Sequence, residues 1–383
     1  MSRPKVAIVH DYLNQAGGAE RVVAVFRKMF PDAPIFTTIV DRDKLYPELR
    51  DADIRTTFMQ RIPGILKRFK LFFWLYPIAV RTLDVRGYDL VLSSSSAYAK
   101  GIRKGRGAVH LCYCHTPMRF AWDFESYMEG VGVPRPVKAA AKWLTVPLRA
   151  WDRANSRRVD RIVANSSVVQ QRIRSHYGVH APVIYPPVDV DRFAVSAERP
   201  GDYFLVVSRL VSYKRIDLAV EACTRTGRRL LVVGDGPDRK RLEAMAGPTV
   251  EFLGRRSDGD VVRLMQGCRA LLFPGEEDFG ITPLEANACG RPVVAYAGGG
   301  ALDTVVPGVN GVFFRERSAE SLERALAEQE AHEWDPRRIR RHAESFHERV
   351  FVSRLEEAIR GLTGHAEPVA KRAAGAAEVK AVR

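Results

Sequence analysis

The sequence has few cysteines and no long apolar run. No stretch approaches the roughly 18 apolar residues that a membrane-spanning helix needs. The first apolar segment, Val6–Val9, is too short for a secretion signal and predicts a first strand instead. The cysteines are odd in number and lack C-x-x-C spacing, which predicts a reduced, cytosolic chain without a zinc site. They are Cys112, Cys114, Cys223, Cys268 and Cys289.

Positive charge is abundant but unevenly distributed. The chain has 383 residues, a length that suffices for two domains of ordinary size. Hydrophobic residues make up 46% and charged residues 27%, a composition typical of soluble globular proteins. The formal net charge is +15, and residues 1–190 hold 30 lysines and arginines against 16 acids. The first half therefore carries nearly all of the excess. Such asymmetry indicates an anionic partner, either a nucleic acid or a membrane surface.

Segments typical of strands and helices alternate along the chain, which predicts parallel sheets covered by helices on both faces. A proline-rich break at Tyr185–Asp189 separates two such series. We therefore expect two α/β domains, over residues 1–187 and 188–345, with a cleft between them. The expected strands are Val6–Asp11, Ile35–Val40, Leu90–Ser93, Ala108–Tyr113, Arg161–Ala164, Tyr203–Ser208, Leu230–Gly234 and Val250–Leu253.

The end of the chain has a different composition. His347–Leu362 has helical spacing, so a helix is expected in the segment 346–363. Residues 364–383 are rich in Ala, Lys and Glu and have no apolar face. That composition predicts a disordered tail.

Two glutamates eight residues apart, Glu277 and Glu285, form the most informative segment. They follow the apolar run Ala270–Pro274, a predicted strand end, and lead into a predicted helix. Open sheets bind ligands at the carboxyl ends of their strands, and free amides at a helix N-terminus hold anions. The glutamates can accept hydrogen bonds from hydroxyls, so the segment fits a nucleotide sugar. An ordinary strand-loop-helix with solvated acids fits the spacing equally well.

The segment resembles the E-x7-E motif of retaining glycosyltransferases of family 4. The resemblance implies a GT-B fold, in which two Rossmann-like domains with parallel sheets face each other across a cleft and the C-terminal helix returns to the first domain. It further implies that Glu277 binds donor-sugar hydroxyls, that Glu285 binds the ribose, and that the amides of Phe279, Gly280 and Ile281 face the sugar and diphosphate. The matching residues are Glu277, Phe279, Gly280, Glu285, Ala286, Gly290, Pro292 and Val293.

Two further loops fit donor binding. Gly17 and Gly18 open a predicted helix, where paired glycines let amides approach a phosphate, although a plain turn also explains them. Arg209 and Lys214 follow a predicted strand and could clamp a diphosphate, although a solvated basic loop is the usual explanation. The stretches resemble the family's first glycine-rich loop and its Arg-x4-Lys motif, which assigns all four residues to the donor. Arg215 is expected to lie outside the direct contacts.

The remaining glycine-rich turns carry less information. Gly234–Pro237 lacks the third glycine of G-x-G-x-x-G and predicts a strand-to-helix turn rather than a dinucleotide site. Gly254 and Arg255 match the region that contacts the nucleotide base in the family, largely through the backbone. Gly298–Gly300 resembles the family's last glycine-rich turn, but the acid that usually follows is replaced by the more distant Asp303, whose role is in doubt.

His115 ends a predicted strand of the first domain. A lone histidine is more often structural, but the string from His115 to Arg119 resembles family members, among them bacterial mannosyltransferases, that act on lipid-linked glycans. The resemblance makes His115 a donor-sugar or active-site residue and leaves Arg119 and Asp123 as weaker candidates for the acceptor side. The catalytic set expected from all motifs is His115, Arg209, Lys214 and Glu277.

The basic half also contains two amphipathic stretches. Gly64–Tyr76 has apolar residues at helical spacing with cations beside them, and Arg135–Arg158 carries Trp143, Leu144, Leu148 and Trp151. Core helices with solvated cations explain both stretches, but the charge asymmetry favours a membrane interface. The residues expected at the membrane in the first stretch are Lys67, Arg68, Lys70, Phe72, Phe73 and Trp74.

The sequence therefore predicts a retaining hexosyltransferase that is peripheral to the inner face of the plasma membrane. The expected donor is GDP-mannose, and the expected acceptor is a lipid-linked oligosaccharide of surface polysaccharide or O-antigen synthesis. A UDP-sugar with a soluble acceptor is the alternative within the fold. An NAD-dependent oxidoreductase and a nucleic-acid-binding protein are alternatives of other classes, but the glycine fingerprint is incomplete and no nucleic-acid motif is found. No metal or other cofactor is expected, and no nucleic-acid partner.

Overall fold

The structure is a computed structural model that describes residues 4–127, 135–196 and 199–363. The tail expected over residues 364–383 lies outside the described residues. The chain divides into two compact units. One contains the residues up to Pro187 and those from Arg349 on, and the other is Val188–Glu348.

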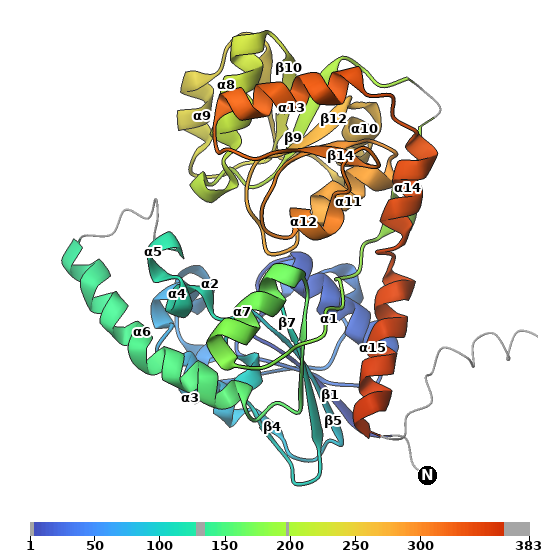
Figure 1. The fold of residues 1–383 in the computed structure, drawn as a ribbon. Coiled ribbons are helices and arrows are strands. Elements are labelled where there is room, and N and C mark those ends of the chain that lie inside the picture. The colour runs from blue at the N-terminus through green and yellow to red at the C-terminus, as the bar shows by residue number, and fades with distance from the viewer. Residues whose placement is uncertain (1–3, 128–134, 197–198, 364–383) are drawn as a thin grey trace, which may run out of the picture. The chain divides into compact units, whose positions relative to one another are not determined.

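The first unit is built on a parallel sheet of six strands in the order β3-β2-β1-β5-β7-β8 (Figure 1). Its central strands are almost fully buried because helices cover both faces, as hydrophobic parallel strands require. Its strands are β1 (Val6–His10), β2 (Ile35–Thr37), β3 (Ile54–Thr56), β5 (Leu90–Ser95), β7 (Val109–Cys114) and β8 (Arg161–Ala164), and β4 (Asp84–Val85) pairs with β6 (Arg103–Lys104). Its helices are α1 (Gly18–Met29), α2 (Ile65–Arg68), α3 (Tyr76–Ala79), α4 (Arg119–Trp122), α5 (Phe124–Tyr127), α6 (Arg135–Ser156) and α7 (Ser167–Tyr177).

The second unit repeats the architecture, with the strand order β11-β10-β9-β12-β13-β14, all parallel. When the six strands of each sheet are numbered along the chain, both orders read 3-2-1-4-5-6. This is the doubly wound order, in which the direction of strand addition reverses between strands 1 and 4. Its strands are β9 (Tyr203–Val207), β10 (Arg229–Val233), β11 (Val250–Gly254), β12 (Ala270–Phe273), β13 (Val293–Tyr296) and β14 (Gly311–Phe314). Its helices are α8 (Ile216–Thr226), α9 (Arg239–Met245), α10 (Asp258–Gly267), α11 (Ile281–Ala288), α12 (Ala301–Thr304), α13 (Ala319–Ala331) and α14 (Pro336–Glu344).

The last helix, α15 (Glu348–Thr363), packs on the first unit beside α1 (Figure 1). Phe351 stacks on Phe26 with 6.3 Å between ring centroids and meets Tyr113 edge-on at 5.4 Å. Leu355 and Ile359 are buried in the same cluster. The end of the described chain is thus part of the core of the first unit.

Several expected boundaries shift by a few residues. The strand expected over Ile35–Val40 ends at Thr37, because the next amide, that of Thr38, donates to the Asp11 carbonyl outside the sheet ladder. The helix expected from Pro237 begins at Arg239, after a turn. The strands expected from Val6 to Leu253 are all present, with shifts of a few residues at their ends.

The continuous amphipathic helix expected over Gly64–Tyr76 is wrong. The chain instead forms α2, a 3-10 turn at Phe69–Phe72 and α3, and the backbone leaves the helical region at Arg68, where φ is −121° and ψ is 15°. Ideal helical spacing would place Phe69, Phe72, Phe73 and Tyr76 on one face and Trp74 alone on the opposite side. The breaks allow Phe72 and Phe73 to lie half-buried against the cluster that contains Tyr76.

The second expected amphipathic helix is present as α6, which runs along the outside of the first unit (Figure 1). Its inner face is held by a buried ion pair between Asp152 and Lys100, whose charged atoms are 2.8 Å apart. Its outer face exposes Trp143, Leu144 and Val146. No helix among the described residues is long and apolar enough to cross a bilayer.

Candidate active site

Lys214 and Glu277 meet at the point where the strand order of the second unit reverses. Lys214 lies in the loop after β9, and Glu277 lies in the loop after the neighbouring strand β12. The Lys214 ammonium and the Glu277 carboxylate form an ion pair, with 13% and 26% of the side chains exposed. A doubly wound sheet binds ligands at this reversal point, so a cation and a carboxylate face the place where a ligand is expected.

Close backbone contact brings the two loops together. A Cβ atom on Gly275 would lie 2.8 Å from both the Cα and the carbonyl oxygen of Lys214. Any larger residue would push the β12 loop away from the β9 loop. Gly275 therefore permits the ion pair between Lys214 and Glu277, and neither expected motif included it.

The other two cations of the β9 loop differ in their surroundings. Arg209 is exposed and donates from Nη2 to the Tyr213 hydroxyl at 3.1 Å. Arg215 binds the Asp217 carboxylate at 3.2 Å and adopts φ of 51°. Arg215 and Lys214 are therefore each paired with a carboxylate, whereas the hydrogen bond from Arg209 to Tyr213 leaves its charge without a counter-ion among the described residues.

The β12 loop continues directly into α11. Gly280 is the N-cap, Ile281 is the first helical residue, and the Phe279 side chain is buried beneath them. Glu285 lies on α11, one turn after its start, and is half-buried. The structure therefore joins Glu277, the first helical amides and Glu285 in one short segment. Hydroxyl acceptors at both ends and amide donors between them suit a phosphorylated sugar.

Gly300 packs against this segment. Its amide donates to the Glu277 carbonyl at 2.8 Å, and a Cβ atom there would lie 2.2 Å from the Cα of Phe279. The glycines after β13 are thus needed for close approach to the Glu277 loop. Asp303 lies in the first turn of α12, and its role stays open.

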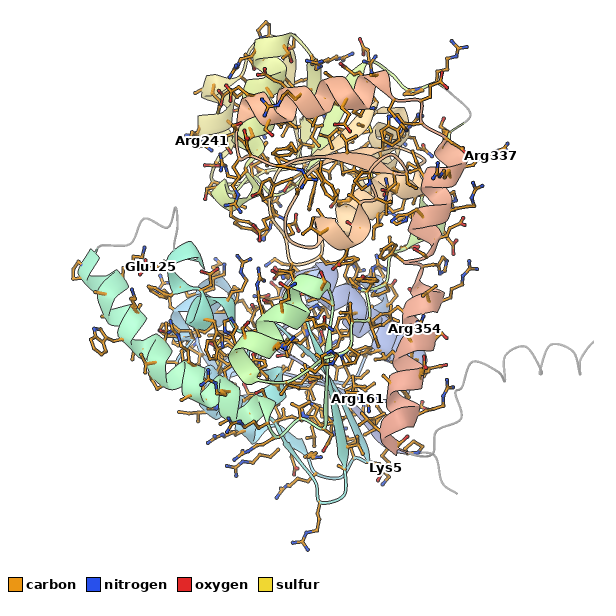
Figure 2. All side chains as sticks on the ribbon, in the orientation of Figure 1. Lys5, Glu125, Arg161, Arg241, Arg337 and Arg354 are labelled. Carbon is orange, nitrogen blue, oxygen red and sulfur yellow. The ribbon has the colours of Figure 1, made fainter. Side chains whose placement is uncertain are left out.

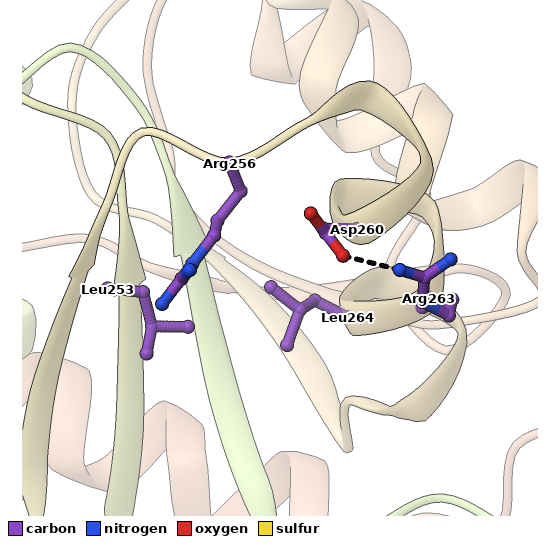
Figure 3. Close-up of a pocket in the computed structure, with 5 residues that line it drawn as sticks. All are labelled: Leu253, Arg256, Asp260, Arg263 and Leu264. Carbon is purple, nitrogen blue, oxygen red and sulfur yellow. Dashed lines mark hydrogen bonds and ion pairs between the residues drawn. The ribbon is translucent and has the colours of Figure 1, made fainter.

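Gly254 ends β11, and Arg255 after it is exposed. Beside them, a pocket of about 290 Å³ lies between β11 and α10 (Figure 3). Asp260 binds Arg263 there, and Arg256 extends along the opposite wall (Figure 3). The lining residues are Leu253, Arg256, Asp260, Arg263 and Leu264.

In the first unit, His115 follows β7 at the carboxyl edge of the sheet and is 8% exposed. Its Nε2 lies 2.8 Å from the Ser94 hydroxyl. Burial and the neighbouring His10 lower the pKa of His115 to about 3. The ring is therefore neutral at physiological pH.

The two weaker acceptor candidates, Arg119 and Asp123, lie at the two ends of α4. Arg119 is its first residue, and its Nε is buried without a hydrogen-bond partner among the described residues. Asp123 is the exposed C-cap, and its amide donates to the Arg119 carbonyl at 2.7 Å. Both residues follow His115 closely in the sequence.

Gly17 and Gly18 start α1 as expected. The Gly17 amide, however, donates to the Glu20 carboxylate at 3.0 Å, in a capping box. Glu20 is itself buried, with its carboxylate 3.7 Å from His10 Nε2. In the structure the first amide of this loop is therefore bound by a side chain of the protein, which sequence reasoning missed.

Asp11 is a second buried acid that sequence reasoning missed. Its carboxylate accepts hydrogen bonds from four consecutive amides of the loop after β5, at 2.6–2.9 Å. These amides belong to residues 96–99, and the carboxylate caps the short helix that begins there. Asp11 therefore fixes the shape of the loop that follows Ser94 and Ser95. An aspartate directly after the first strand was the only signal in the sequence.

Two family models match the chain in succession. The model described as Glycosyltransferase Family 4 matches residues 16–192, and the model described as Glycosyl transferases group 1 matches residues 188–346. Together they match residues 16–346. The chain belongs to the family 4 glycosyltransferases and has their GT-B fold. This membership agrees with the resemblance of the Glu277–Glu285 segment to the E-x7-E motif of that family.

Two relatives of this glycosyltransferase are named as mannosyltransferases. The human alpha-1,3/1,6-mannosyltransferase is 25% identical over 362 residues, which cover 81% of this chain and 83% of that protein. A GDP-mannose-dependent alpha-mannosyltransferase of Mycobacterium tuberculosis is 30% identical over 201 residues, which cover 50% of this chain and 51% of that protein. The match thus spans only about half the length of the mycobacterial enzyme.

The fold is also similar to the Anabaena protein HepE, whose structure was solved in complex with UDP. The TM-score is 0.71 at 18% identity, and the match covers 94% of this glycosyltransferase and 100% of HepE. At this identity the likeness supports the shared fold.

Proposed function

We propose that this glycosyltransferase moves a hexose with retention of the anomeric configuration, using a nucleotide-diphosphate sugar. The observation that carries the proposal is the pairing of Lys214 with Glu277 at the strand-order reversal. It provides a cation for the diphosphate beside a hydroxyl acceptor for the sugar. Arg209 adds a second cation, and the α11 amides add donors.

The proposed step is substitution on one face of the sugar. The acceptor oxygen forms a bond to the anomeric carbon as the bond from that carbon to the phosphate breaks, and the leaving phosphate oxygen accepts the acceptor's proton. Lys214 and Arg209 stabilise the charge that develops on the phosphate. Such preorganised electrostatics contribute roughly 3–4 kcal/mol for each donor.

Mannose from GDP-mannose is the favoured donor. Its support comes from the two relatives named as mannosyltransferases, one of them named as GDP-mannose-dependent. A UDP-sugar is the second candidate, since the similar protein HepE was solved with UDP. The exposed Arg255 does not help to choose between the two bases, because the resemblance implies that this region contacts the base largely through the backbone.

We further propose a lipid-linked oligosaccharide of surface polysaccharide or O-antigen synthesis as the acceptor, reached from the inner face of the plasma membrane. The support is the charge excess of residues 1–190 together with exposed apolar side chains of the first unit. Trp74 is 53% exposed beside Lys67, Arg68 and Lys70, and Trp143 on α6 is 79% exposed. Aromatic side chains and cations together suit a membrane surface.

A ligand panel tests the proposal. Thermal unfolding with GDP, UDP, NAD and a DNA duplex should show stabilisation by nucleoside diphosphates alone, because a ligand stabilises only the fold that binds it. Turnover of GDP-mannose and a set of UDP-sugars against a membrane extract then identifies donor and acceptor. Stabilisation by NAD or DNA instead would favour the oxidoreductase or the nucleic-acid-binding protein.

A further inference from the structure

Four buried side chains form a connected row at the carboxyl edge of the first sheet. The Glu20 carboxylate lies 3.7 Å from His10 Nε2, and His10 Nδ1 lies 3.0 Å from the Ser94 carbonyl oxygen and 3.1 Å from its hydroxyl. The same hydroxyl lies 2.8 Å from His115 Nε2. The members come from α1, β1, β5 and the end of β7, so only the sheet order brings them together.

The position of one proton follows from the Ser94 carbonyl. A carbonyl oxygen can only accept, so the His10 Nδ1 must carry hydrogen and donate to it. The other ring nitrogen then faces the Glu20 carboxylate, which favours a proton there as well. Burial by itself lowers the pKa of His10, but the hydrogen bond and charge of Glu20 outweigh it and leave that pKa raised.

The position of the next proton follows from Ser94. Because His10 Nδ1 carries a hydrogen, it cannot accept from the Ser94 hydroxyl, so the hydroxyl hydrogen must point elsewhere. It has two acceptors: His115 Nε2 at 2.8 Å and the Ala19 carbonyl at 3.5 Å. A hydroxyl hydrogen directed along the shorter contact makes Ser94 the donor to His115 Nε2. A neutral His115 that accepts at Nε2 carries its hydrogen on Nδ1.

We propose that Ser94, oriented by His10 and Glu20, is a positioning residue that holds His115 as the neutral tautomer with hydrogen on Nδ1. His115 then presents a hydrogen-bond donor to its ligand and does not serve as a general base. The ligand group is an acceptor oxygen, which under the proposed function is a hydroxyl of the donor sugar. That last step rests on the proposed function, whereas the tautomer itself does not.

The chain provides a matched control one residue away. Ser93 and His110 lie on the same two strands, and their side chains also form a buried hydrogen bond, at 2.7 Å. Ser93→Ala therefore removes the same kind of bond from the same sheet without touching the row that contains Ser94.

Nitrogen-15 NMR of histidine-labelled full-length protein tests the tautomer directly. The wild type and Ser93→Ala should show His115 with hydrogen on Nδ1, assigned by the loss of its signals in His115→Asn. Ser94→Ala should lose that preference. A wild-type His115 with hydrogen on Nε2, or an Nδ1 tautomer that persists in Ser94→Ala, would overturn the proposal.

Kinetics with the donor identified by the panel give the second readout. Loss of one oriented hydrogen bond should lower turnover in Ser94→Ala by about 10-fold. Ser93→Ala should keep wild-type turnover. An asparagine side chain can place its amide nitrogen near the position of the histidine Nδ1. His115→Asn should therefore retain more turnover than His115→Gln. The reverse order would contradict a hydrogen-bond donor at Nδ1. If no sugar is transferred at all, the proposed function fails while the NMR result still decides the tautomer.

Discussion

Lys214 and Glu277 bind each other although their positions in the sequence are far apart. Each neutralises the other's charge, and both are more buried than most charged side chains. When a nucleotide-diphosphate sugar binds, we expect the Lys214 ammonium to bind the phosphate and the Glu277 carboxylate to bind a sugar hydroxyl. The pair is thus a compact, pre-assembled part of the proposed donor site.

Lys214→Ala should lower turnover by about 100-fold or more with the fold intact, because one preorganised donor to the leaving phosphate is lost. Steady-state kinetics and circular dichroism measure this. Lys240→Ala, which removes an exposed lysine of α9, serves as the control and should behave as the wild type. Wild-type turnover in Lys214→Ala would remove Lys214 from the site.

Substitutions of Glu277 and Glu285 should affect the binding of a free nucleoside diphosphate differently. Glu285→Gln should weaken binding of the free nucleoside diphosphate, because the proposed ribose contact exists without the sugar. Glu277→Gln should leave that binding nearly unchanged and reduce transfer. Calorimetry with GDP and UDP measures both, and the opposite order would show that the two roles are assigned the wrong way round.

Transfer should not require a metal ion. The cations Arg209 and Lys214 are proposed to stabilise the phosphate charge that a divalent metal stabilises in other enzymes. We therefore expect full activity after dialysis against EDTA. Activity that disappears in EDTA and returns with Mg²⁺ or Mn²⁺ would refute the metal-free scheme.

The first unit should bind anionic membranes. Each cation near such a surface contributes about 1 kcal/mol, so changing Lys67, Arg68 and Lys70 to Glu should abolish flotation with anionic liposomes. Attachment of the wild type should weaken as salt increases. Trp74 should add an apolar contribution that salt does not screen, whereas the half-buried Phe72 and Phe73 contribute less than a free helix would allow.

A control for flotation needs the same change in net charge at another place. Arg337, Arg338 and Arg341 are exposed on α14 of the second unit, and Figure 2 shows Arg337 projecting from this helix. Their triple change to Glu should leave flotation intact. Equal flotation of both triple variants, or none by the wild type, would favour a soluble acceptor.

Removing one partner of the buried pair of Asp152 and Lys100 should strongly destabilise the first unit. Asp152 also accepts from Trp122 Nε1 and the Tyr177 hydroxyl, each at 2.7 Å. Asp152→Asn leaves the Lys100 ammonium buried without its counter-charge and should lower the free energy of unfolding by about 3–5 kcal/mol. Chemical denaturation measures this loss.

Lys142→Ala provides the comparison for this stability experiment. It breaks the ion pair with Glu125 at 2.8 Å, which lies on the surface beside the N-terminal half of α6 (Figure 2). Exposed pairs contribute at most about 1 kcal/mol, so this variant should unfold nearly as the wild type does. Equal losses in the two variants would contradict the importance of burial.

The sequence by itself determined the features that local spacing encodes. The alternation of strands and helices predicted two parallel α/β units, and Glu277 and Glu285 lie on one continuous strand-loop-helix segment, so their relation could be predicted without the rest of the chain. The Gly64–Tyr76 stretch shows the limit of the same reasoning. Its periodicity and its cations predicted an amphipathic helix at a membrane surface, but packing decided that a broken chain holds Phe72 and Phe73 half-buried against the first unit.

Tertiary structure alone decided which loops meet. Lys214 reaches Glu277 because β9 pairs with β12 and Gly275 allows their loops to touch, and neither fact is visible in local spacing. The row from Glu20 to His115 depends in the same way on β1, β5 and β7 lying side by side. Hydrogen bonds between residues distant in sequence follow strand order, and strand order is set by the packing of the whole sheet rather than by any single segment.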